Sequence, residues 1–129
     1  MGRQASVYDQ VGGMPFFEQL VERFYVHVVD DPPLLAHYPE PDDLGPARRR
    51  LHLFLAQYFG GPTTYSDERG PPRLRQRHFP FVVDSDARDR WLRAMRAALD
   101  DVAPPPQAEA AMWEYFCMAA PAMQNTDES

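Results

Sequence analysis

One histidine stands in the most basic stretch of this acidic chain. Residues 72–81 read Pro-Arg-Leu-Arg-Gln-Arg-His-Phe-Pro-Phe and contain His78. Arginines at positions 69, 73, 75 and 77 concentrate positive charge there, although the net charge of the chain is −6. The pattern predicts that His78 ends a short helix against apolar surface. Taken alone, such a histidine is more often a hydrogen-bonded structural residue than a ligand.

The neighbourhood of this histidine narrows what it could bind. A zinc site needs several nitrogen or sulfur ligands, but the only cysteine, Cys117, is 39 residues away and no His-x-x-x-His spacing occurs. Haem needs one neutral imidazole, an apolar slot for the macrocycle, and cations at the rim to meet two propionates. Arginine suits that rim because its planar guanidinium pairs with carboxylates through two hydrogen bonds. His78 and its arginines are therefore compatible with haem.

Composition limits the alternatives. The net negative charge argues against nucleic-acid binding, because that function needs an excess of cations. All thirteen cationic residues are arginine. The sequence shows no signal segment and no apolar run of roughly 18–20 residues, so we expect a cytoplasmic protein without a membrane span. A length of 129 residues suits one domain. Cys117 stands in an aromatic and methionine-rich stretch and is expected to be buried.

Apolar residues recur at helical spacing along most of the chain. The predicted helices cover about Met14–Asp30, a segment of about 44–58, a segment that begins near Asp84 or Ser85 and continues to Val102, and about Gln107–Gln124, with a short turn of helix over Leu34–His37. The polar stretch Thr63–Gly70 predicts a structured loop. No sustained alternation occurs, so we expect an all-α protein with four main helices and one long irregular connector.

Several fragments of the sequence occur together in one known family. They are Tyr8-Asp9-x-Val11-Gly12-Gly13, Arg23-Phe24-Tyr25, Tyr38-Pro39-Glu40, Phe54-Leu55-x-Gln57-Tyr58, Gly60-Gly61-Pro62-x-Thr64-Tyr65-Ser66, Arg73-Leu74-Arg75-x-Arg77-His78 and Arg90-Trp91-Leu92. In order and spacing the chain resembles the group II (O-type) truncated haemoglobins from about Val7 to Asn125. The resemblance implies a truncated globin, a two-over-two helical sandwich with a short proximal helix. It also implies a single domain over residues 1–129, with its core at about 7–125.

The resemblance also implies roles for individual residues. His78 would be the proximal iron ligand of haem b (iron protoporphyrin IX). The propionates would be contacted by Arg50, Tyr65, Arg77 and Arg73, and the macrocycle would pack against Phe54, Leu74 and Phe81. The distal side would carry Tyr25, Tyr38 and Trp91, with Ala47 and Leu51 on the distal helix. The remaining histidines, His27, His37 and His52, are expected to be exposed or structural.

The three polar aromatics indicate what the distal side would do. Tyrosine O–H and indole N–H groups can stabilise the partial negative charge of a dioxygen ligand in a dry pocket. The first hypothesis is a globin that binds dioxygen, and NO or CO, and releases dioxygen slowly. The alternative is a haem redox enzyme, an NO dioxygenase or peroxidase-like protein that depends on a separate reductase. A ligand sensor or a haem-free module is a third class. The sequence leaves monomer and homodimer open.

Overall fold

The computed structural model describes the backbone of residues 6–38, 42–70 and 84–122, with side chains as far as residue 120. The elements in these ranges are α1 (Val7–Gln10), α2 (Met14–Val29), α3 (Pro32–Leu35), α4 (Gly45–Tyr58), α5 (Thr64–Arg69), α7 (Ser85–Val102) and α8 (Pro106–Ala122). Every element in the described ranges is a helix, which confirms the predicted all-α class. Among these helices, none is both long and apolar enough to cross a membrane.

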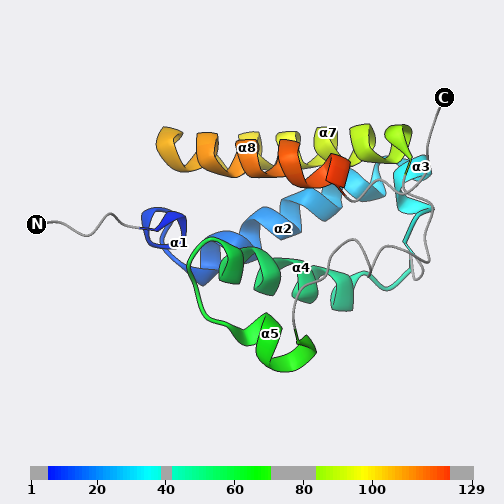
Figure 1. Cartoon of the computed structure of the whole chain (residues 1–129). Helices are drawn as coiled ribbons and strands as arrows, with labels where there is room; N and C mark the ends of the chain where they lie inside the picture. The colour runs from blue at the N-terminus through cyan, green and yellow to red at the C-terminus, as the bar shows by residue number, and fades with distance from the viewer. Residues whose placement is uncertain (1–5, 39–41, 71–83, 123–129) are drawn as a thin grey trace, which may run out of the picture.

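The long helices form two layers. Figure 1 shows α7 and α8 running side by side across one face of α2, with α4 on the other side of α2 and α5 beneath α4. Helix α2 is the centre of the fold because it packs against both α4 and α7. Its buried side chains are Phe17, Leu20, Val21, Phe24, Tyr25 and Val28. The predicted two-over-two sandwich is confirmed.

Local capping defines the ends of the helices that concern the site. The carboxylate of Asp84 accepts a hydrogen bond of 2.9 Å from the backbone N–H of Ala87, which caps α7 at the predicted position. Asp31 caps α3 in the same way, because its Oδ1 accepts from the backbone N–H of Leu34 at 3.4 Å. Helix α3 comes directly after α2, since Pro32 and Pro33 cannot continue α2 but fit the first turn of a new helix.

A close approach of two segments explains one of the glycine pairs. A Cβ atom on Gly61 would lie 2.5 Å from the ring of Tyr8 and 2.8 Å from the carbonyl oxygen of Ala56. Gly60 has φ of +108°, in the region that favours glycine. The backbone N–H of Tyr8 donates to the carbonyl of Phe59 at 2.9 Å. The pair thus lets α1 lie against the end of α4.

Two expectations from the sequence are wrong. The stretch predicted as a loop over Thr63–Gly70 contains the helix α5, which is held by a contact between distant residues: Gln57 donates to the Ser66 hydroxyl at 2.7 Å and accepts from the Ser66 backbone N–H at 3.0 Å. Cys117, expected to be buried, is exposed. Its neighbour Phe116 faces the core instead, at 1% exposure, and the next residue along a helix points about 100° away.

Candidate functional site

The three polar aromatics predicted for the distal side come together in the structure. Tyr25 lies on α2, Tyr38 follows α3 by three residues, and Trp91 lies on α7. The rings of Tyr25 and Tyr38 meet edge to face, with centroids 5.6 Å apart. Phe24 packs against Tyr25 at 5.0 Å and against Trp91 at 5.2 Å. Three segments that are distant in sequence therefore form one aromatic cluster, which we call the distal cluster.

The polar ends of this cluster lie close enough to share hydrogen bonds. The Tyr38 hydroxyl is within hydrogen-bonding reach of the Tyr25 hydroxyl and of the Trp91 indole N–H. Burial raises the pKa of Tyr25 to about 12, against smaller lowering effects from the Tyr38 hydrogen bond and from the charges of Arg50 and Arg48. Burial also raises the pKa of Tyr38 well above its ordinary value. Both tyrosines thus keep their protons well beyond neutral pH, where an ordinary tyrosine is also protonated, and can act as donors.

Arg48 is a neighbour of the cluster that the sequence analysis did not single out. Its guanidinium carbon lies 5.7 Å from the centroid of the Tyr25 ring, within the range of a cation–π contact. Its Nε is buried and, among the described residues, has no hydrogen-bond partner. In the sequence Arg48 is one of three consecutive arginines on α4, and nothing in that run distinguishes the one that turns inward. Only the packing of α4 on α2 does so.

Helix α4 carries further predicted site residues. Ala47 and Leu51 are half-buried and pack against the core. Phe54 and Tyr65 are both buried, and their rings meet at 5.5 Å, which connects α4 to α5. Arg50 is exposed. Outside the described residues lie the other predicted site residues, which are His78, Arg73, Leu74, Arg77 and Phe81.

The chemistry of these residues fits haem. Tyr38, Ala47, Leu51 and Trp91 each pack on the core by one side and remain partly accessible by the other. They offer apolar surface for a macrocycle together with O–H and N–H donors for a ligand, and exposed Arg50 on the same helix as Ala47 and Leu51 offers a cation for a propionate. The described part of the chain contains no group of three or more His, Cys, Asp or Glu side chains that could hold a metal ion directly.

Two histidines of the described ranges, His27 and His52, lie in surroundings that the structure defines. His27 Nε2 lies 2.7 Å from Asp101 Oδ2, which also accepts from Arg23 Nε at 3.1 Å, so His27 helps to connect α2 to α7. His52 is half-buried on α4, and burial lowers its pKa. The His27 contact is structural, as the sequence predicted for that residue.

Comparison with known proteins identifies the family. The family model for bacterial-like globins matches residues 6–125. The chain is 38% identical over 102 residues to the group 2 truncated hemoglobin YjbI of Bacillus subtilis, covering 79% of this chain and 76% of that protein. Among solved structures, the thermostable hemoglobin of Thermobifida fusca is 54% identical with a TM-score of 0.92, over 96% of this chain and 100% of that chain. The group II truncated hemoglobin of Bacillus anthracis is 34% identical with a TM-score of 0.93, over 99% and 97%. The chain belongs to the bacterial-like globins, within the group II truncated haemoglobins, and is therefore a haem-binding globin.

Proposed function

We propose that this globin holds dioxygen on haem b and releases it slowly, with His78 as the proximal ligand and the distal cluster facing the gas. Haem supplies an iron atom that binds diatomic gases, NO and CO among them. The observation that supports retention is the convergence of Tyr25 from α2, Tyr38 from the segment after α3 and Trp91 from α7, with their polar groups within hydrogen-bonding reach of one another.

The distal cluster would act by donating hydrogen bonds. The tyrosines are neutral at pH 7, as ordinary tyrosines are, and burial raises their pKa values further. The Trp91 N–H has no other ionisation state near neutral pH. The contacts among Tyr25, Tyr38 and Phe24 hold these groups in place before a ligand arrives, so little reorganisation is needed. Each donor to a partly charged ligand is worth about 1–2 kcal/mol. One donor then slows release by roughly tenfold, and several by orders of magnitude.

The other predicted residues would hold the cofactor. Arg50, Arg77 and Tyr65, with Arg73, would meet the propionates, since guanidinium groups and a hydroxyl can both donate to carboxylates. Phe54, Leu74 and Phe81 would pack against the macrocycle. Ala47 would leave room for ligand entry beside Leu51, because it is small and half-buried. Replacement of His78 by Ala would abolish the normal Soret spectrum of the haem-supplemented protein.

Stopped-flow dioxygen dissociation from the ferrous protein tests retention. Trp91→Phe removes the indole N–H but keeps an aromatic ring, so we expect release to become roughly tenfold faster. Trp113→Phe is the matched control: Trp113 lies on α8, stacks with the Arg96 guanidinium, and is not part of the distal cluster. A wild-type rate like that of a fast oxygen carrier, or equal effects of the two substitutions, would contradict the proposal.

A second candidate function is haem redox catalysis, as an NO dioxygenase or a peroxidase-like enzyme with a separate reductase. One observation favours it. A series of neighbouring aromatic rings leads from Trp91 to the surface. The ring centroids of Trp91 and Phe116 are 5.6 Å apart, and those of Phe116 and Tyr115 are also 5.6 Å apart. The Tyr115 ring lies 4.0 Å from that of Tyr58, which is half-exposed. Such a series could carry an electron between the cluster and the surface. Steady-state turnover with an external reductant tests it, and Phe116→Leu should slow turnover if the series is used.

A further inference from the structure

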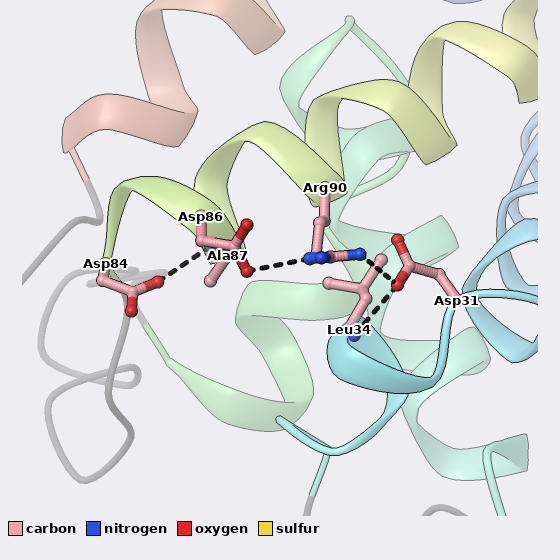
Figure 2. A network of polar contacts seen from close by, with 6 residues as sticks. All are labelled: Asp31, Leu34, Asp84, Asp86, Ala87 and Arg90. Atoms are coloured by element: carbon pink, nitrogen blue, oxygen red, sulfur yellow. Dashed lines mark hydrogen bonds and ion pairs between the residues drawn. The ribbon is translucent and has the colours of Figure 1, made fainter.

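Arg90 precedes Trp91 on α7 and joins two carboxylates. Its Nε donates to Asp86 Oδ2 at 2.8 Å, one turn earlier on α7, and its Nη1 donates to Asp31 Oδ1 at 2.8 Å. Figure 2 shows the guanidinium lying between the two carboxylates, so that α7 is connected to the start of α3. The Arg90 and Asp31 side chains are only 28% and 23% exposed.

The short helix that Arg90 holds is weak by itself. Helix α3 has four residues, far fewer than an isolated helix needs. The same Asp31 oxygen that accepts from Arg90 also accepts the capping hydrogen bond from the Leu34 N–H. The carboxylate therefore performs both tasks, capping α3 and docking it on α7.

Tyr38 depends on this helix for its position. Backbone hydrogen bonds run from Leu35 N–H to the Asp31 carbonyl at 2.9 Å and from Tyr38 N–H to the Leu35 carbonyl at 3.0 Å. Tyr38 is thus connected to Asp31 through two consecutive turns. At the other end of the network, Trp91 directly follows Arg90, and its indole N–H lies within hydrogen-bonding reach of the Tyr38 oxygen. A displacement of α3 relative to α7 would separate Tyr38 from both Tyr25 and Trp91.

We propose that Arg90 is a positioning residue that holds Tyr38 against Trp91 and Tyr25 by docking Asp31, and with it α3, on α7. The inference rests on the proposed ligand-donor role of the distal cluster. Arginine suits the task because its two donating nitrogens fix the plane of the guanidinium, whereas lysine offers a single point charge.

The test compares Arg90→Met with Arg96→Met in the haem-loaded protein. Arg96 is a matched control, because it also lies on α7 and pairs with two carboxylates, Asp100 and Glu109, but it connects α7 to α8. Hydrogen exchange, followed by mass spectrometry, reports on the backbone amides of residues 34–38. We expect Arg90→Met to speed exchange of these amides about tenfold and Arg96→Met to leave it unchanged.

Infrared spectroscopy of the ferrous carbon monoxide complex supplies a second readout. The C–O stretching band is sensitive to hydrogen-bond donors beside the ligand, so a displaced Tyr38 should shift part of the band to higher frequency. We expect that shift in Arg90→Met and a smaller one in Arg90→Lys. Asp31→Asn keeps an oxygen for the α3 cap and removes the charge, so it provides a second variant if Arg90→Met does not fold.

The outcomes separate this inference from the proposed function. If Trp91→Phe moves the band but Arg90→Met and Asp31→Asn leave both band and exchange at the wild-type level, the positioning role is wrong and the donor role stands. If Trp91→Phe leaves the band unmoved, the donor role is wrong, and the exchange of residues 34–38 alone decides whether Arg90 holds α3. Equal effects of Arg90→Met and Arg96→Met on exchange would also overturn the inference.

Discussion

Each half of α7 contains an arginine that pairs with two carboxylates, but the two arginines connect α7 to different parts of the molecule. Near its start, Arg90 pairs with Asp31 and Asp86 beside Trp91, which belongs to the distal cluster. Near its end, Arg96 pairs with Asp100 and Glu109 and lies 5.0 Å from the Trp113 ring centroid. Both arginines connect α7 to another helix. Only the first connects it to a segment that carries a proposed ligand-contacting residue, so the neighbours of an ion pair decide whether it bears on function.

The largest expected effect comes from the core beneath the first half. Phe24 is fully buried between Tyr25 and Trp91. Phe24→Ala should lower the free energy of unfolding by about 3–5 kcal/mol, measured by urea denaturation, because it leaves a cavity. Leu99→Ala, in the second half of α7 and equally buried, should cost about 2–5 kcal/mol. Only Phe24→Ala should also change the carbon monoxide band. A band change with Leu99→Ala would contradict the division of α7 into two halves.

Alkaline pH tests the burial of Tyr25. Below pH 10 the folded and unfolded states both keep the proton, so Tyr25 adds no pH dependence. Above pH 10 the unfolded state loses its proton first, because burial raises the pKa of folded Tyr25 to about 12, and stability falls as pH rises. The loss should reach about 1–2 kcal/mol by pH 11.

Urea denaturation at pH 9 and pH 11 measures this loss, and Tyr25→Phe should make it smaller. Tyr115, on α8, also has a pKa raised to about 12 by burial and, secondarily, by Tyr58. Tyr115→Phe should therefore flatten the pH dependence as well, while dioxygen release stays at the wild-type rate. Faster release in Tyr115→Phe would show that the two regions are not independent.

The cap of α7 should give a smaller effect. Asp84→Ala removes the hydrogen bond to the Ala87 N–H and should cost about 1 kcal/mol of stability by thermal denaturation. Asp84→Asn keeps an acceptor and serves as the control. If the cap also helps to hold Trp91, dioxygen release from Asp84→Ala will be faster than from the wild type. That result would show that the start of α7 also affects the distal cluster.

The smallest effect is expected at the second arginine. Arg96→Met should cost about 1 kcal/mol or less, because ion pairs whose side chains are one-third to two-thirds exposed contribute little. Its dioxygen release should match the wild-type rate. High salt should reduce the difference in thermal stability between the wild type and this variant. If Arg96→Met changed dioxygen release as much as Arg90→Met does, the proposed difference between the two halves of α7 would be wrong.

Much of the fold was predictable because it depends on local interactions. The spacing of Leu20, Phe24 and Val28 predicted one buried face of α2. The start of α7 was predicted near Asp84 or Ser85 from their capping chemistry, and Asp84 is the cap. The tyrosines and tryptophan of the distal cluster came from resemblance to the family, since an aromatic on a helical face is ordinarily core filling. Their roles as ligand donors stay predictions.

Distant contacts were not predictable from local pattern. Helix α5 is a polar hexapeptide held by Gln57, and Cys117 points outward although its neighbours in sequence are apolar. Likewise, a run of three arginines does not show that Arg48 is the one that turns inward. For α5 and Arg48 the deciding partner lies on another element, and for Cys117 the direction depends on which face of α8 packs on the core.

The amino-acid sequence by itself determined the main helices, their ends, the family and the identity of the residues proposed to meet haem and its ligand. Periodicity, capping and proline act over a few neighbouring residues and are therefore legible along the chain. Tertiary structure decided that Tyr25, Tyr38 and Trp91 meet, and that Arg90 reaches Asp31 across 59 residues. Such meetings depend on how whole helices pack, because the partners lie far beyond the range of local chain geometry.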